Sequence, residues 1–260
     1  MYRKEGFFKG LANYNLFYQY WLPSSNQRAI LLIAHGFAEH SGRYANLVDY
    51  LVPRGWAVYA LDHRGHGKSD GDRVQVDLFS DYVDDLKTYF DLVRKDNPGK
   101  KIFLVGHSMG SAIAILYTSR YQNGLAGLVT SGGGIDKLGN QSPQPQAEGQ
   151  PLGTSFLSRD PEVIKAYEND PLVYRGPVPT GLRGMMSDIS DVVPLIKIPA
   201  LIMAGNAVAD GTRSRALYEA LSSKDKTLKL YDGLRHEIFN EPEHIQVISD
   251  MAIWLENHLS

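Results

Sequence analysis

The sequence contains no cysteine among its 260 residues. Disulfide bonds, thiolate nucleophiles and thiolate metal ligands are therefore excluded. Long hydrophobic runs are also missing, since no apolar stretch reaches the roughly 20 residues that a membrane-spanning helix needs. The first residues, Met1 to Gly6, carry charges instead of the apolar core of a signal peptide. We therefore expect a chain without a membrane anchor, located in the cytoplasm.

A large excess of either charge is absent as well. Lysine and arginine number 27 against 29 acidic residues, the formal net charge is −2, and the isoelectric point is near 6.4. Nucleic acid is therefore not an expected partner. The length suits one large α/β domain, and the sequence gives no indication of the oligomeric state.

Short apolar runs alternate with segments of helical spacing along most of the chain. Runs typical of buried strands occupy residues 29–34, 57–61, 102–105, 127–130, 200–204 and 228–231, after two aromatic-rich strands at 7–11 and 14–21. Helices are expected over residues 44–51, 78–94, 112–121, 214–221 and 244–258. Repeated alternation of this kind predicts the fold class α/β, with a mostly parallel central sheet and helices on both faces.

The alternation stops after Ser131 and resumes at Ala200. Residues 132–155 are polar and low in complexity, a composition that offers little apolar surface for folding. Helices are predicted beyond this stretch, over residues 159–167 and 182–195. We therefore expect a core made of residues 1–131 and 197–260, and a cap (lid) insertion over residues 132–196. An insertion between two sheet strands would lie over the strand ends, where ligands bind.

The sequence Gly106-His107-Ser108-Met109-Gly110 follows directly on one of the buried strands and precedes a helix-prone segment. Gly-x-Ser-x-Gly between a strand and a helix is the pattern of a nucleophilic serine on a sharp turn. The glycines leave room for the close approach of the strand and the helix. Ser108 is the predicted nucleophile.

A serine nucleophile needs a base, and hydrolases with this turn place an acid and then a histidine later in the chain. His236 lies in a loop just after the last predicted strand, whereas His244 and His258 fall in a helical pattern. His236 is therefore the predicted base. Chain order favours Asp210 as the acid, although Asp210 could also cap the following helix, and Asp136 stays open as an alternative.

The oxyanion of an acyl-transfer reaction needs backbone N–H donors that are fixed before the reaction. We expect them at Met109, directly after the nucleophile, and at Phe37, in the loop after the strand at residues 29–34. Two pairs of histidines, His35/His40 and His63/His66, lie in loops without a completing carboxylate cluster. No metal ion and no cofactor are therefore expected.

Four motifs together resemble the monoacylglycerol lipase and lysophospholipase family of α/β-hydrolases. They are His35-Gly-Phe-Ala-Glu-His-Ser-Gly-Arg-Tyr44, Asp62-His-Arg-Gly-His-Gly-Lys-Ser69, Gly106-His-Ser-Met-Gly110 and His236-Glu-Ile-Phe-Asn-Glu-Pro242. The resemblance implies a serine ester hydrolase that cleaves monoacylglycerols or related single-chain esters through an acyl-enzyme. It also implies that Glu39 and Arg43 lie near the polar head of the substrate, although an internal ion pair that steadies the loop explains them equally well.

The chain departs from the family pattern in two places. The cap segment is polar and shorter than the amphipathic helical cap of the family, and a natural short member or a deliberate deletion would leave the same sequence. The family pattern Gly-x-x-Asp would place the acid at Val208, so the loop before Asp210 looks about two residues short. These departures leave a lysophospholipase, an acyltransferase and a catalytically weakened binding protein as alternatives.

The polar cap also bears on substrate size. Leu152 is the one large aliphatic side chain between Gly139 and Ser155, so we expect short to medium acyl chains to be preferred. The remaining lining is expected from Phe37, Met109, Phe156, Leu157, Met185 and Met186. The expected partners are an acyl ester substrate and, transiently, a membrane or micelle surface.

Overall fold

The computed structural model describes residues 1–24, 26–135, 150–179 and 189–259. The described part contains one eight-stranded sheet with the strand order β1-β2-β4-β3-β5-β6-β7-β8. The strands are β1 (Tyr2–Lys9), β2 (Asn15–Leu22), β3 (Ala29–Ala34), β4 (Trp56–Leu61), β5 (Ile102–His107), β6 (Gly127–Ser131), β7 (Ala200–Gly205) and β8 (Lys226–Tyr231). β1 and β2 run antiparallel to their neighbours, and strands β3 to β8 are parallel. The predicted fold class is confirmed.

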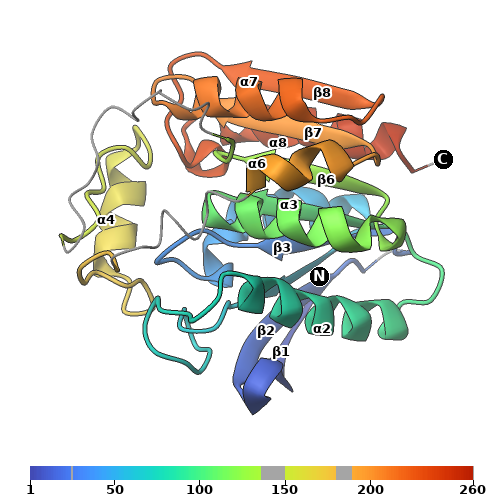
Figure 1. The fold of residues 1–260 in the computed structure, drawn as a ribbon, viewed down its shortest axis with the longest axis horizontal. Coiled ribbons are helices and arrows are strands. Elements are labelled where there is room, and N and C mark those ends of the chain that lie inside the picture. Colours follow the sequence, from blue (N-terminus) through green and yellow to red (C-terminus); the bar gives the residue numbers. More distant parts are fainter. Residues whose placement is uncertain (25, 136–149, 180–188, 260) are drawn as a thin grey trace.

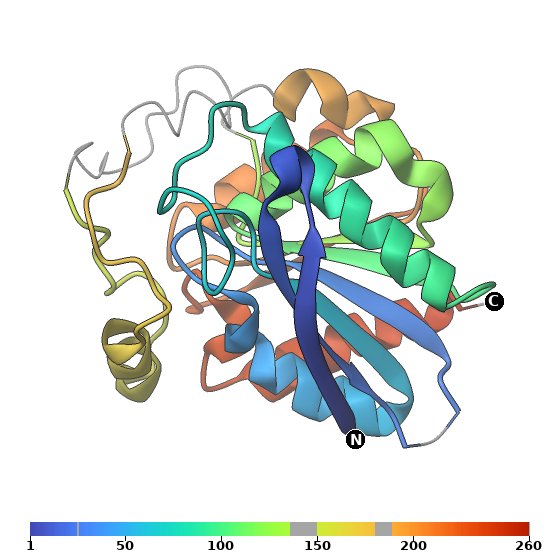
Figure 2. The same ribbon diagram turned by 90° about the horizontal axis from the view of Figure 1, so that it is seen from below.

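Helices cover both faces of the sheet (Figures 1 and 2). The helices packed on the sheet are α1 (Ala45–Leu51), α2 (Ser80–Asp96), α3 (Met109–Tyr121), α7 (Asp210–Ala220) and α8 (His244–Asn257), together with the short α6 (Ile189–Val192) from the end of the predicted cap insertion. Ile30 and Leu32 of β3 belong to the apolar cluster on one face, and Leu31 and Ile33 to the cluster on the other. Strand β3 is therefore a continuous apolar run because both of its faces are buried.

The N-terminal hairpin differs from its prediction. β1 begins at Tyr2 and ends at Lys9, whereas the sequence predicted a strand over residues 7–11. Its first four residues are exposed and include charged side chains, so they carry no apolar pattern. Main-chain pairing with β2 holds this edge strand, and such pairing leaves no trace in hydrophobic periodicity.

The chain between β6 and β7 leaves the sheet at its carboxyl edge. Its described part contains α4 (Pro161–Asn169), which Figure 1 shows set apart from the core helices. α4 begins at Pro161 after Asp160, whose carboxylate accepts from the Glu162 N–H at 2.9 Å. Leu157, Tyr167 and Val173 form a small apolar cluster of their own here. The predicted helix over residues 182–195 lies partly outside the described residues; its last part forms α6 and the turn Val193–Leu195.

No helix in the described ranges is both long and apolar enough to cross a membrane.

Candidate active site

Ser108 lies on the turn between β5 and α3. Its backbone angles are φ 54° and ψ −119°, a combination that costs an L-residue conformational energy. The close approach explains the two glycines: a Cβ on Gly106 would lie 2.3 Å from the Gly110 carbonyl oxygen, and one on Gly110 would lie 2.0 Å from the Ala34 carbonyl oxygen. The Ser108 N–H donates to the carbonyl of Ser131 at 2.8 Å. The strand–turn–helix context predicted from the sequence is present.

His236 and Asp210 form a hydrogen-bonded pair. The distance between His236 Nδ1 and Asp210 Oδ2 is 2.6 Å, and both side chains are largely buried. Burial lowers the pKa of His236, but the charge and the hydrogen bond of Asp210 outweigh it, so the pKa lies above its ordinary value of 6.5. His236 and Ser108 line the same cavity.

Asp210 reaches His236 because α7 begins at Asp210 itself, four residues earlier than predicted. The short preceding loop is held by two main-chain bonds, from Asn206 N–H to the Tyr231 carbonyl and from Ala207 N–H to the Leu234 carbonyl, each 3.0 Å long. The loop therefore lies against the same strand end from which His236 emerges. Asp136, the alternative acid, lies outside the described residues.

Two hydrogen bonds fix the main chain of Gly36 in the loop after β3. The Gly36 N–H donates to Glu39 Oε1 at 2.6 Å, and the Gly36 carbonyl lies 2.8 Å from His35 Nδ1. Because a carbonyl only accepts, His35 Nδ1 carries the proton, and Nε2 is free to accept from the His63 N–H at 2.9 Å. The Gly36 carbonyl and the Phe37 N–H belong to one trans peptide and point in opposite directions. The Phe37 N–H is thus turned away from His35, and Gly36 and Phe37 both line the cavity.

The rings of three buried histidines, His35, His63 and His66, cluster behind this loop. The ring centroids of His63 and His66 lie 4.4 and 5.3 Å from that of His35. Burial lowers the pKa of His35 and of His66 to about 3, and it lowers the pKa of His63 well below 6.5. All three are therefore neutral at physiological pH.

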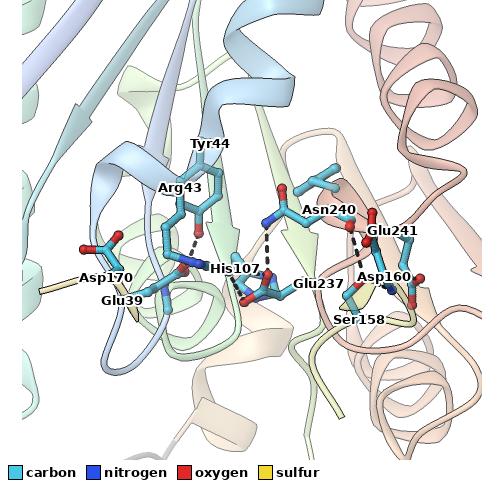
Figure 3. A network of polar contacts seen from close by, with 12 residues as sticks. Glu39, Arg43, Tyr44, His107, Ser158, Asp160, Asp170, Glu237, Asn240 and Glu241 are labelled. Carbon is cyan, nitrogen blue, oxygen red and sulfur yellow. Dashed lines mark hydrogen bonds and ion pairs between the residues drawn. The ribbon is translucent and has the colours of Figure 1, made fainter. Parts of the chain in front are cut away.

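An ion-pair network lies beside the loop (Figure 3). Arg43 donates to Glu39 at 3.2 Å and to both oxygens of Glu237 at 2.9 and 2.6 Å, and Tyr44 donates to Glu39 at 2.7 Å. Burial and the charge of Glu237 raise the pKa of Glu39. Glu39 and Glu237 line the cavity, whereas the Arg43 side chain is buried between them.

Ser108, Asp210 and His236 line a cavity of about 640 Å³, together with Glu39 and Glu237. Apolar and aromatic side chains form part of its wall. They are Phe37, Leu152, Phe156, Leu157, Tyr167, Val208 and Ala209. Phe37, Leu152, Phe156 and Leu157 are expected lining residues; Met109 is buried at the start of α3 and is not among the lining residues, and Met185 and Met186 lie outside the described part.

Tyr167 and Glu237 are among the contributors to this cavity that the sequence interpretation missed. Tyr167, in α4, lies under the Arg43 guanidinium with 4.6 Å between the guanidinium carbon and the ring centroid. Glu237 is the second carboxylate of the ion-pair network. Glu237 follows His236 directly in the fourth motif, but the motif alone does not predict that its partner is Arg43.

The family model described as serine aminopeptidase, S33, matches residues 25–243. A monoacylglycerol lipase of Mycolicibacterium smegmatis is 34% identical over 99% of this chain and 98% of its own length. The human monoglyceride lipase is 32% identical over 92% of this chain and 86% of its own. Among solved structures, a monoacylglycerol lipase from Paleococcus ferrophilus has 29% identity and a TM-score of 0.79 over 94% of this chain and 99% of its own. A carboxyl esterase from Bacillus coagulans, 24% identical, has a TM-score of 0.87 over the full length of both chains and shows the shared fold.

Proposed function

The chain belongs to the family described as serine aminopeptidase, S33, and from this we propose that it is a serine ester hydrolase that cleaves monoacylglycerols. The observation that carries the proposal is the 2.6 Å bond between His236 and Asp210 at a cavity that Ser108 also lines. The near-full-length similarity to a monoacylglycerol lipase supports the substrate class.

In the proposed reaction, Ser108 Oγ attacks the ester carbonyl while His236 takes its proton, and Asp210 keeps the imidazole oriented. The N–H groups of Phe37 and Met109 stabilise the oxyanion. Collapse of the tetrahedral intermediate breaks the ester bond, and His236 returns the proton to the leaving glycerol oxygen. Water, activated by the same histidine, then releases the fatty acid from the acyl-enzyme.

The ion-pair network would receive the polar end of the substrate. Glu39 and Glu237 line the cavity, and carboxylate oxygens accept from the hydroxyl groups of a glycerol. Arg43 lies between the two carboxylates, so we propose that it holds them in place and acts on the substrate through them. The contacts support the internal ion pair for Arg43, and the position of Glu39 in the cavity wall supports a substrate contact for Glu39.

We propose residues 132–196 as a cap that supplies the wall for the acyl chain, with residues 1–131 and 197–260 as the core. The lining positions of Leu152, Phe156 and Leu157 support this division. Because monoacylglycerols gather in membranes and micelles, we also propose a transient contact with such surfaces, and we keep the cytoplasm as the proposed location.

The test is hydrolysis of a soluble short-chain monoacylglycerol by the purified protein, with Ser108→Ala as the matched control. We expect fatty acid release by the native protein, rapid labelling by a fluorophosphonate probe, and neither in the variant. An aminoacyl anilide and a lysophospholipid as parallel substrates, and an added alcohol acceptor, distinguish peptidase, lysophospholipase and acyltransferase activities. Turnover that survives in Ser108→Ala would refute the proposal.

A further inference from the structure

Glu241 belongs to the fourth sequence motif, and the proposed reaction gives it no role. Its side chain is completely buried, and a buried carboxylate needs several donors. Glu241 Oε1 accepts from the Arg235 N–H at 2.6 Å. Oε2 accepts from the Arg159 N–H and from Arg159 Nε, both at 3.1 Å, and lies 3.4 Å from Ser158 Oγ.

The donors of Glu241 come from two segments that are distant in sequence. Arg235 directly precedes His236, and Arg159 belongs to the segment between β6 and β7. Figure 3 shows Ser158 beside Asn240 and Glu241, and Ser158 Oγ donates to the Asn240 carbonyl at 3.1 Å. One carboxylate thus connects the inserted segment to the loop that carries His236.

The two segments also pair through their main chains. The His236 N–H donates to the Phe156 carbonyl at 3.1 Å, and the Glu237 N–H donates to the Leu157 carbonyl at 2.7 Å. The Arg235 guanidinium donates to the carbonyls of Ser155 and Ser158 at 2.7 and 2.9 Å. The ring of Phe156 lies against that of His236, with 5.2 Å between their centroids.

We infer that Glu241 is a positioning residue for His236: it fixes the Arg235–His236 backbone against residues 155–159 and so sets the place of the imidazole. This inference rests on the proposed function. In the proposed reaction the His236 imidazole bonds to Asp210 through one nitrogen and takes the proton of Ser108 with the other. A displacement of the imidazole by about 1 Å can therefore lower the rate by two orders of magnitude. Glu241 acts on the imidazole through the backbone, without touching the substrate.

The experiment compares Glu241→Gln with Glu243→Gln. The amide in Glu241→Gln keeps the shape of the carboxylate but replaces one acceptor oxygen with a donor, so it cannot accept from both segments. Glu243 also pairs with Arg159, but it is half-exposed and directly precedes α8, so we expect its variant to make the same charge change without loosening His236. Active sites are counted by fluorophosphonate labelling, and kcat per labelled site and KM are measured on a soluble short-chain ester across pH.

We expect Glu241→Gln to lower kcat per labelled site by about tenfold or more, with KM within about twofold of the native value. The acid limb of its kcat profile should move to lower pH, because a loosened His236 loses part of the Asp210 interaction that raises its pKa. Glu243→Gln should keep the native kcat and pH profile.

A role in stability alone would lower the melting temperature and the labelled fraction of Glu241→Gln while leaving kcat per site and the pH profile unchanged, and this result would overturn the inference. If Glu241→Gln does not fold, Arg159→Gln is measured instead. In that variant Glu241 still accepts from the Arg235 N–H but no longer from the Arg159 guanidinium. We expect a fall in kcat per site of about threefold in that variant, and a native value would equally overturn the inference. A native protein whose Ser108 does not label would instead refute the proposed function, and the role of Glu241 with it.

Discussion

Ser108 occupies a backbone conformation that only glycine adopts without cost. With φ at 54° and ψ at −119°, the residue stores strain of about 1–3 kcal/mol. The surrounding contacts of β5 and α3 hold the residue in place against this strain. The hydroxyl that the proposed reaction requires at the tip of the turn is therefore held at a cost to the stability of the fold.

Two substitutions of Ser108 separate the need for its hydroxyl from the strain of its backbone. Ser108→Ala and Ser108→Gly should both abolish ester hydrolysis, but only glycine relieves the strain, at some entropic cost in the unfolded chain. We expect Ser108→Gly to be more stable than Ser108→Ala by about 1 kcal/mol in urea unfolding. Equal stabilities of the two variants would show that the turn carries no strain.

Asp210 is the residue whose loss should change both the rate and its pH dependence. Asp210→Asn should lower kcat by roughly four orders of magnitude, as expected when a triad aspartate becomes an amide. In the native protein the acid limb of kcat/KM should lie above pH 6.5, because Asp210 raises the pKa of His236 and only the neutral imidazole acts as base.

The Asp210→Asn variant lacks the carboxylate that raises the pKa of His236, while burial still lowers that pKa. The acid limb should therefore move to lower pH. The matched control is Asp232→Asn, which removes a carboxylate that contacts Asn206 at the surface. A near-native rate for Asp210→Asn would move the acid to Asp136.

Single residues differ in how far the sequence predicts them. Ser108 and its two glycines form a local pattern, since a strand, a turn and a helix are contiguous in the chain. Asp210 was favoured by chain order alone, because the start of α7 depends on how the loop packs against β8. Glu241 lies in one of the four motifs, but the sequence predicts no role for it, because its donors, Arg159 and Arg235, are 82 and 6 residues away in the chain.

Among the elements, strands buried on both faces were predicted closely, and the edge strand β1 and the start of α7 were not. A doubly buried strand such as β3 needs apolar side chains at every position, so its bounds are visible in the sequence. The edge strand β1 and the start of α7 depend on main-chain bonds to distant residues. Residues 155–159, between β6 and β7, are the extreme case, since main-chain and polar bonds to residues 235–241 connect them to the core.

That segment determines the prediction on acyl-chain length. Burial of each methylene contributes about 0.8 kcal/mol, and the described insertion adds the side chains of Leu152, Phe156, Leu157 and Tyr167 to the wall. We expect kcat/KM to rise over short and medium acyl chains and then to level off. Monomeric C4, C8, C12 and C16 esters measure this, and a steep rise that continues to C16 would contradict it.

Phe156→Ala tests the same wall at one position. It should reduce kcat/KM for the C8 ester more than for the C4 ester, because a long chain loses more contact area, while the Phe156 carbonyl still accepts from His236. Ile164→Ala, in the small cluster of the insertion but not among the lining residues, is the control. Equal losses on both esters would place Phe156 outside the acyl site.

The molecule as a whole buries several histidines in the neutral form. His35, His63, His66 and His107 are all buried, and the pKa of each lies well below 6.5. The unfolded chain binds a proton at each of them below about pH 6.5, whereas the folded chain does not. The folded state therefore loses stability as the pH falls, at about 1.4 kcal/mol per pH unit for each histidine.

Four such groups amount to about 5.6 kcal/mol per pH unit, which is comparable to the whole stability of a domain. His236 acts in the opposite sense, but only between 6.5 and its raised pKa. We therefore expect the protein to unfold near pH 5, and urea titrations at pH 7 and pH 5 measure the loss. A stability that is equal at both values would contradict the prediction.

His63→Phe isolates one of these groups. Within the described residues neither ring nitrogen of His63 has a hydrogen-bond partner, so phenylalanine forfeits no bond there. The loss of stability between pH 7 and pH 5 should be about 2 kcal/mol smaller than in the native protein. The control is Phe79→Leu, which exchanges one non-titrating side chain for another in the same aromatic cluster. It should change the stability of the protein without changing how that stability depends on pH.

The main-chain pairing of residues 156–157 with residues 236–237 leaves the side chains of Phe156 and Leu157 open to substitution. Phe156 and Leu157 contribute only their carbonyl oxygens to the pairing, and every amino acid carries that group. Their side chains, which line the cavity, can therefore be exchanged in evolution or in laboratory selection without altering the bonds that hold His236. Specificity at the proposed acyl site and the placement of the proposed base can thus change independently, although both depend on the same few residues of the chain.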